Sequence, residues 1–175
     1  VGFLQEISTA DGSIVSDDGD AVPDVPATPG DTDWWKLTSD SVDALAIGRT
    51  DVATYENSVF YSLRRGSSSL LYWGRTDGTA SQTDGEPYSL RGEIKGTGIT
   101  GRTTGLQFRN ENLGTLYGVS TGGQFYSVSI GTGAATLVAD FAADLAAVGG
   151  GTTGFQGLAT APVNLEGGRY QGKFF

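Results

Sequence analysis

The sequence predicts an all-β protein assembled from repeated four-stranded antiparallel sheets. Three observations support this fold class: 28 glycines among 175 residues, short segments of alternating polar and apolar residues, and an internal repeat of about 55 residues. Glycine at this frequency, without a collagen-like period and with aromatic residues spread along the chain, is typical of many tight turns between short strands. The sequence therefore disfavours a helical bundle.

The clearest repeat unit lies at residues 113–138, LGTLYGVSTGGQFYSVSIGTGAATLV. Alternating residues predict strands, and the glycine-containing segments between them predict turns. The predicted elements, in order, are strand 116–120, turn 121–123, strand 124–130, turn 131–133 and a strand from Ala135. The unit is thus a series of consecutive strands joined by short turns.

A second copy of this pattern lies at residues 58–80, SVFYSLRRGSSSLLYWGRTDGTA. Gly78 and Gly133 are 55 residues apart and Phe60 and Leu116 are 56 apart, so the two copies agree within one residue. A sheet of four short strands cannot bury both of its faces alone, and it requires neighbouring sheets stacked around an axis. Such an arrangement is a β-propeller, and we expect the chain to form part of one.

Partial copies of the unit flank the two full ones. GFLQEISTADGSIVSD near the start matches the later half of the unit, and GFQGLATAP with GRYQGKFF near the end matches the first half. We therefore expect both ends of the chain to fall within a blade. The expected organisation is a half blade of later strands at 1–16, an acidic, proline-rich crossing at 17–42, blades at 43–97 and 98–148, and a half blade of first strands at 149–175.

One short helix is expected in this β chain, at residues 139–148, ADFAADLAAV. Phe141, Leu145 and Val148 share one face of such a helix, and Asp140 is a candidate N-cap. The glycines that follow Val148 are a stop signal. We expect the helix to pack against the body of the protein.

The composition excludes several kinds of chemistry. The chain contains no Cys, no His and no Met. Without thiols or imidazoles it has no disulfide framework, no zinc site of the usual kind, and no Ser-His-Asp or Cys-His nucleophile. Acid–base catalysis near neutral pH would depend on carboxylates, Tyr or Lys.

Charge is unevenly distributed along the chain, whose formal net charge is −9. Residues 1–44 hold ten acidic residues and one basic residue, which accounts for the whole excess, whereas residues 45–175 hold ten of each. Such a chain repels phosphate backbones, so nucleic acid is not an expected partner. No run of about 18 apolar residues occurs, so we expect no membrane insertion.

Four carboxylates gather in the acidic segment: Asp17, Asp18, Asp20 and Asp24. Carboxylate oxygens in a glycine-containing loop are the ligands that Ca²⁺ prefers. The segment lacks the EF-hand spacing and its terminal bidentate Glu. Two interpretations stay open, a solvated acidic loop and a calcium site. No other cofactor is expected.

Arginine and aromatic residues gather in the first full blade: Arg64, Arg65, Tyr72, Trp73 and Arg75. Guanidinium groups and aromatic faces suit the recognition of carbohydrates or carboxylates. A strand pair also carries aromatic partners across it, and alternation would bury one of Tyr72 and Trp73 while exposing the other. Cross-strand packing and a ligand-binding site are therefore both hypotheses for these residues.

A hydrolase mechanism would need two carboxylates at a suitable separation. The candidates are Glu56, Asp84, Glu86, Glu93 and Glu111, and their positions relative to the predicted strand ends indicate no pairing. We therefore expect no catalytic residues and no enzymatic activity.

The segment LYGVSTGGQFYSVSIGTGAATLV resembles the repeats of secreted bacterial β-propellers. GFQGLATAP, and GLQF at residues 105–108, resemble the opening strand of a blade in such proteins. The resemblance covers roughly residues 43–175. These repeats occur in very large exported or cell-surface proteins, including those of planctomycete-like bacteria, so the resemblance implies an extracellular or cell-surface location.

These observations predict a non-catalytic structural or interaction module of an extracellular protein, as a segment of a larger β-propeller chain. Its expected partners are the remaining blades, in the parent chain or in another subunit, because a partial blade leaves strand edges that must pair. A lectin-like propeller that binds carbohydrate is the alternative, and a carboxylate-based hydrolase is the third hypothesis.

Overall fold

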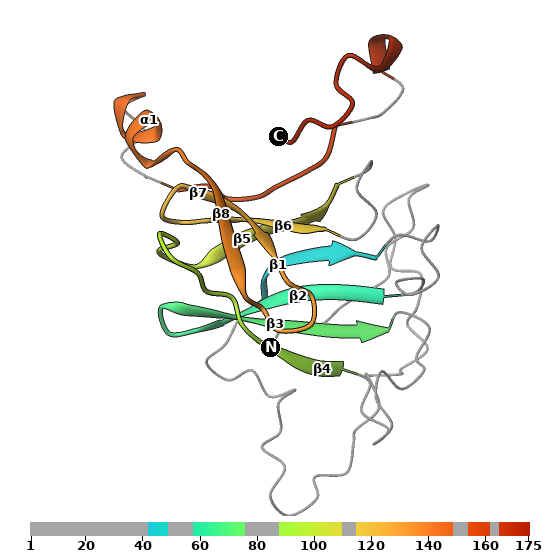
Figure 1. The fold of residues 1–175 in the computed structure, drawn as a ribbon, viewed down its shortest axis with the longest axis vertical. Coiled ribbons are helices and arrows are strands. Elements are labelled where there is room, and N and C mark those ends of the chain that lie inside the picture. Colours follow the sequence, from blue (N-terminus) through green and yellow to red (C-terminus); the bar gives the residue numbers. More distant parts are fainter. Residues whose placement is uncertain (1–41, 49–57, 76–87, 110–114, 149–153, 162–164) are drawn as a thin grey trace, which may run out of the picture. The chain divides into compact units, whose positions relative to one another are not determined.

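The structure is a computed structural model that describes residues 42–48, 58–75, 88–109, 115–148, 154–161 and 165–175. These residues form two four-stranded antiparallel sheets, one short α-helix and one 3-10 helix (Figure 1). The prediction of a mostly β chain with a short helix is thereby confirmed for this part of the protein. The half blade predicted at 1–16, and all but the last residue of the crossing predicted at 17–42, lie outside the described residues.

Both sheets have their strands in chain order. The first contains β1 (Val42–Ile47), β2 (Ser58–Arg65), β3 (Ser68–Arg75) and β4 (Tyr88–Glu93). The second contains β5 (Thr103–Phe108), β6 (Leu116–Ser120), β7 (Gln124–Val128) and β8 (Ala135–Asp140). Strands were predicted at residues 116–120 and 124–130; β6 has the predicted bounds, and β7 ends at Val128.

Glycines occupy two tight hairpin turns, β2–β3 and β6–β7, where the backbone leaves the ordinary strand conformation. Gly66 joins β2 to β3 with a φ of 62°, and Gly123 precedes β7 with a φ of 87°. Residues with a side chain rarely adopt these angles, whereas glycine does so without strain. The glycine-rich pattern of the sequence therefore marks the ends of these strands correctly.

The two sheets share the positions of their irregularities. The ladder between the first and second strands shifts register between Val42 and Ala44 in one sheet, and between Thr103 and Gly105 in the other. The ladder between the third and fourth strands shifts beside Leu71 in the first sheet and beside Phe125 in the second. Each shift adds a residue to one strand, which bends it and changes the direction of the next side chain.

The hydrophobic core lies between the two sheets, and β5 packs alongside β1. The first sheet contributes Ala44, Ala46, Phe60 and Leu71, and the second contributes Leu106, Phe108, Leu116, Tyr126 and Val128. The Phe60 and Phe108 rings meet edge to face, with centroids 5.4 Å apart. Each fully buried side chain of this size contributes on the order of 2 kcal/mol, so this interface holds the sheets together.

Polar contacts cross the same interface. Thr103 donates its backbone N–H to the Ser69 hydroxyl at 2.9 Å, and the Ser62 hydroxyl approaches the Thr103 carbonyl at 3.4 Å. A Cβ atom at Gly92 would collide with the carbonyl oxygen of Thr132. The turn before β8 therefore sits directly against the backbone of β4, which only a glycine permits.

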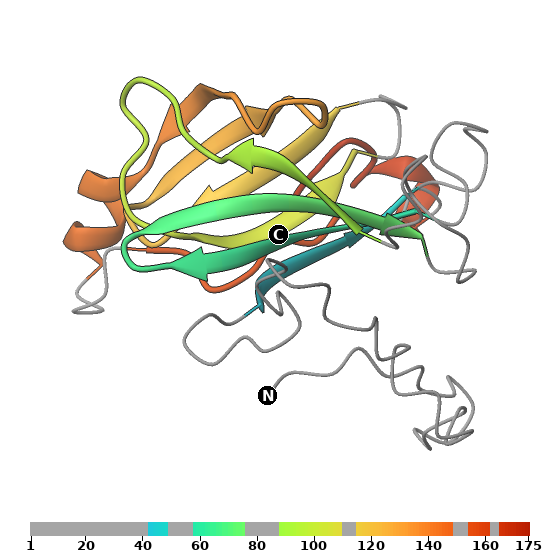
Figure 2. The ribbon, with the colours of Figure 1, turned by 90° about the horizontal axis from the view of Figure 1, so that it is seen from below.

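Residues 154–161 and 173–175 form a third layer, which we call the C-terminal layer (Figure 1). Figure 2 shows the same arrangement from below, with the strands of the first sheet in front. It packs on the face of the second sheet that points away from the first. Phe155 donates its N–H to the Ser120 carbonyl at 3.1 Å, and its own carbonyl accepts the Thr104 hydroxyl at 2.6 Å. Ala159 and Phe175 exchange two backbone hydrogen bonds of 2.8 Å, so the layer contains a short antiparallel ladder.

Two boundaries differ from the sequence predictions. Helix α1 spans Ala142–Ala147 rather than 139–148, because Asp140 belongs to β8 and pairs with Gln124. The Asp140 carboxylate still accepts the Ala142 N–H at 2.9 Å, although Phe141 occupies the N-cap position. Near the end of the chain, where a strand was expected, Thr160 and Phe174 form only an isolated bridge, preceded by the 3-10 helix η1 (Leu165–Gly168).

Candidate functional site

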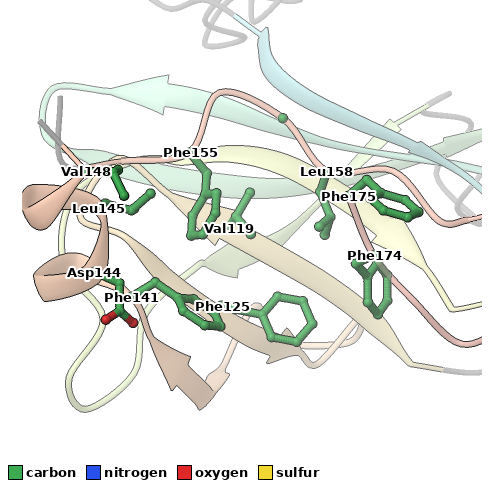
Figure 3. Close-up of a pocket in the computed structure, with 11 residues that line it drawn as sticks. Val119, Phe125, Phe141, Asp144, Leu145, Val148, Phe155, Leu158, Phe174 and Phe175 are labelled. Atoms are coloured by element: carbon green, nitrogen blue, oxygen red, sulfur yellow. The ribbon is translucent and has the colours of Figure 1, made fainter. Parts of the chain in front are cut away.

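The candidate site is an apolar pocket between the second sheet, helix α1 and the C-terminal layer (Figure 3). Its volume is about 440 Å³. Val119 of β6 and Phe125 of β7 form the floor, because alternation turns these residues to the face opposite the core. Phe125, Phe141 and Phe155 project into the same space (Figure 3).

Aromatic contacts hold one wall of the pocket. The Tyr117 and Phe125 rings stack almost parallel across β6 and β7, with centroids 5.3 Å apart. The Phe174 ring of the C-terminal layer leans on both, at 5.2 Å and 5.3 Å. Tilted and stacked pairs of this kind add about 1 kcal/mol each beyond their buried area, so the wall is preformed.

The opposite wall comes from the start of helix α1. The Phe141 ring meets the Phe155 ring at right angles, with centroids 5.9 Å apart. Leu145 and Val148 complete this wall, so the three residues predicted to share a helical face all line the pocket. The side chains that hold the helix against the C-terminal layer are therefore the three that were predicted to share one helical face.

The rim of the pocket remains open to solvent. Phe141 is 38% exposed, Phe175 is 69% exposed and Val148 is 81% exposed. Among the described residues that line the pocket, Asp144 alone carries a charge. The pocket therefore offers apolar contacts and one carboxylate, which suits an apolar side chain and offers little for proton transfer.

Arg64, one of the predicted ligand-binding residues, belongs to an ion cluster between the sheets. Its guanidinium group makes a bidentate contact with Asp43 of β1, at 2.7 Å and 3.2 Å. Arg102, which precedes β5, contacts the same carboxylate at 2.8 Å. Asp43 therefore connects the first sheet to the start of the second.

Tyr72 and Trp73 point to opposite faces of β3. Trp73 lies opposite Phe60 and packs against the core, with the Arg91 guanidinium 4.4 Å from its ring centroid. Burial lowers the pKa of this Arg91 group. The Tyr72 ring stacks on Tyr61 at 5.5 Å. For these aromatic residues, the contacts favour cross-strand packing over a ligand-binding site.

The remaining predicted ligand residues do not join the aromatic pair in a described site. Arg65 is exposed beside the β2–β3 hairpin. Arg75 ends β3, and its side chain lies outside the described part of the chain. The structure therefore brings Arg64 to Asp43, and it separates Tyr72 from Trp73.

The predicted calcium ligands Asp17, Asp18, Asp20 and Asp24 lie outside the described residues. Among the residues that the structure does describe, no group of three or more acidic, His or Cys side chains could hold a metal ion. In the same part of the chain, no helix is long and apolar enough to cross a membrane.

Of the carboxylates considered for hydrolysis, only Glu93 is described. It accepts a hydrogen bond of 2.9 Å from Lys95. This bond, with a further one from Ser68, lowers the pKa of Glu93 below its usual value. Glu56, Asp84, Glu86 and Glu111 lie outside the described residues.

Sequence reasoning did not identify the pocket, although part of its lining was visible in the sequence. The apolar face of residues 139–148 indicated Phe141, Leu145 and Val148. The contributions of Phe125 and Phe174 depend on which face of each strand turns outward, and that requires the register. Comparison of the chain with known protein families, curated proteins and solved structures found no match.

Proposed function

We propose that this chain is a non-catalytic structural and interaction module, a segment of a β-propeller in a larger extracellular or cell-surface protein. One observation carries the proposal: the C-terminal layer lies on the second sheet as the second sheet lies on the first. β5 runs alongside β1, and Gly105 of β5 in turn lies beneath Gly157 and Leu158. Repeated stacking of this kind is how propeller blades bury their faces.

The shared register shifts support the same relation. When the shifts are superimposed, Ala44 corresponds to Gly105, Leu71 to Phe125, and Ser62 to Val119. This superposition differs by one residue from the sequence alignment of Phe60 with Leu116, because it aligns Phe60 with Tyr117. In the first sheet, the face with Ser62 and Leu71 is covered by the second sheet. In the second sheet, the face with Val119 and Phe125 is covered by the C-terminal layer. Each sheet thus receives the next layer on the same face.

The residue pairing within the C-terminal layer matches the pairing of the first two strands of the second sheet. Thr160 lies opposite Phe174, as Phe108 lies opposite Leu116 in the second sheet. Phe175 then corresponds to Tyr117. We propose that its two segments are the first strand and the beginning of the second strand of a further sheet, and that its partners are the other strands of such sheets, in the parent chain or another subunit.

The proposal is tested by completing the third sheet within the chain. A second copy of residues 118–148 is added to the chain directly after Phe175. Phe175 corresponds to Tyr117, and residues 118–148 follow Tyr117 in the second sheet, so the added copy continues the proposed register. We expect a higher melting temperature and more β-structure by circular dichroism, since the added strands would pair with the C-terminal layer and cover the face of the second sheet that carries Val119 and Phe125.

The matched control appends residues 119–148, one residue fewer. A shift of one residue turns every apolar side chain of the added strands to the wrong face, so this extension should remain unfolded and leave the melting temperature unchanged. Equal behaviour of the two extensions would contradict the proposed stacking.

A further inference from the structure

Four polar side-chain atoms of the first sheet are buried without a hydrogen-bond partner. Among the described residues they are the full set in this condition: the hydroxyls of Ser58 and Ser89, the indole Nε1 of Trp73 and the guanidinium Nε of Arg91. Ser58 is 0% exposed and Ser89 is 3% exposed. Because nearly all buried polar atoms in folded proteins are paired, unpaired ones call for a specific explanation. Their grouping in one sheet indicates a shared one.

The strand register brings these residues together on one face of the sheet. Trp73 of β3 lies directly opposite Ser89 of β4 on one side and Phe60 of β2 on the other. Side chains alternate along a strand, so Ser58 shares the face of Phe60 and is a diagonal neighbour of Trp73. This face packs on the second sheet, because the Phe60 ring meets Phe108 there. The unpaired atoms therefore lie at the margin of the core.

All four atoms can donate a hydrogen bond. The Trp73 and Arg91 nitrogens are donors only, whereas the serine hydroxyls can also accept. The Arg91 guanidinium lies 4.4 Å from the centroid of the Trp73 ring, and its charge forms no ion pair with any residue in the described part of the chain. A group that pairs with the whole set must therefore be an acceptor, and a negatively charged acceptor binds a guanidinium more strongly than a neutral one.

We propose that this polar cluster of Ser58, Trp73, Ser89 and Arg91 is a binding site for a small free carboxylate. The two oxygens of a carboxylate accept about four hydrogen bonds, which matches the four unpaired donors. The atoms are shielded from solvent, so a small molecule suits the site better than a carboxylate on a folded partner. The Trp73 ring stays in cross-strand packing, and only its N–H takes part. The site does not depend on the proposed function, because it uses only the first sheet.

The test follows the indole N–H signal of Trp73 in the ¹⁵N-labelled full chain at neutral pH. The chain has three tryptophans, and the Trp73→Phe protein assigns the signal. Sodium acetate should move this signal downfield in a saturable way, because the N–H gains a hydrogen bond. It should also raise the melting temperature, since a ligand that binds only the folded state stabilises it. Sodium chloride at the same ionic strength is the reference and should do neither.

Two arginine variants test the role of the charge. Arg91→Gln should weaken acetate binding by roughly tenfold or more, because charge-assisted hydrogen bonds are lost. Arg65→Gln is the matched control, since it removes the same charge from an exposed position at the end of β2 in the same sheet. It should leave the acetate affinity unchanged.

Ser89→Ala separates binding from a purely structural role, and it serves even where Arg91→Gln does not fold. The Ser89 hydroxyl has no partner in the protein. Its removal should therefore leave the melting temperature in chloride unchanged or raise it. The same variant should bind acetate more weakly than the native protein, because one donor to the carboxylate is gone.

Several results would overturn the carboxylate site. They are the absence of a saturable Trp73 shift at high millimolar acetate, equal acetate affinity of the Arg91→Gln and native proteins, or a lower melting temperature of Ser89→Ala in chloride. An equal shift in chloride alone would assign the effect to salt. Tighter binding of sulfate than of acetate would assign the site to tetrahedral anions, and it would also overturn the proposal.

Discussion

The side chain of Tyr126 is fully buried in the core. Its ring lies against Gly118, where a Cβ atom would stand 2.6 Å from the nearest ring carbon, so the small residue of β6 makes room for the large residue of β7. Its hydroxyl contacts Thr103 and the Val119 carbonyl. Burial raises the pKa of Tyr126 to about 12, against a weaker opposing effect of the Thr103 hydrogen bond.

This pKa shift predicts a loss of stability at high pH. The folded protein retains the phenol proton to about pH 12, whereas the unfolded chain releases it near pH 10. The contribution is fully present below pH 10 and disappears as the pH rises to 12, which amounts to about 3 kcal/mol. Urea unfolding at several pH values should show this decline.

Tyr126→Phe provides the control for that measurement. The variant loses about 1 kcal/mol at neutral pH, because the Val119 carbonyl and Thr103 hydroxyl lose a partner. Its stability should then fall less steeply than that of the native protein between pH 10 and pH 12. Parallel curves for the two proteins would show that Tyr126 does not titrate as its burial requires.

The roles of individual side chains were less accessible from the sequence than the strands that carry them. Cross-strand packing and a ligand-binding site were both hypotheses for Tyr72 and Trp73, and alternation was expected to bury one of them and expose the other. The structure turns them to opposite faces, but both are partly buried. The contact of Arg64 with Asp43 could not be predicted, because Asp43 lies 21 residues away and the pairing depends on the register of β1 and β2.

At the scale of elements, local turn chemistry made the strands predictable. β6 was predicted without error because glycine turns bound a short alternating segment. The bounds of the helix in segment 139–148 were harder to predict. The helical pattern was taken to begin at residue 139, but residues 139 and 140 complete β8. The bridge between Thr160 and Phe174 depends on packing over the second sheet, and the sequence carries no local sign of its short length.

Gly105 of β5 and Gly157 of the C-terminal layer should respond differently to substitution, because only Gly105 has no space for a side chain. A Cβ atom at Gly105 would lie 2.5 Å from the Leu158 nitrogen, whereas one at Gly157 would meet no atom within 4 Å. Gly105→Ala should therefore cost about 1–3 kcal/mol and accelerate amide exchange at Phe155 and Ala159. Gly157→Ala is the matched control and should be neutral or slightly stabilising. Equal effects of the two changes would contradict the close approach of the C-terminal layer.

At the scale of the whole described body, one buried carboxylate joins the sheets. The Asp43 side chain is 8% exposed and holds both Arg64 and Arg102. Its removal leaves two guanidinium groups without this shared partner at the interface. An exposed pair, Lys95 with Glu93, makes an equally short contact of 2.9 Å but lies mostly in solvent.

These two ion pairs should differ in their contribution to stability. Asp43→Asn should lower the free energy of unfolding by about 1–3 kcal/mol, because charge-assisted hydrogen bonds are lost in a shielded position. Lys95→Ala should change it by less than about 1 kcal/mol, since exposed pairs are screened by water and salt. Urea denaturation of both variants measures the difference. A loss for Lys95→Ala as large as that for Asp43→Asn would refute this ranking.

The face that the first sheet turns to its neighbour, with Phe60 and Leu71, differs from the face that the second sheet turns back, with Leu106 and Tyr126. A contact between unlike surfaces has no two-fold axis, and it therefore does not end after two participants. Any uncovered layer can recruit another in the same head-to-tail sense. Loosening the outermost layer, for example by heating, would expose a growing end. Growth from this end gives closed rings where the rotation between layers closes, and linear polymers where it does not.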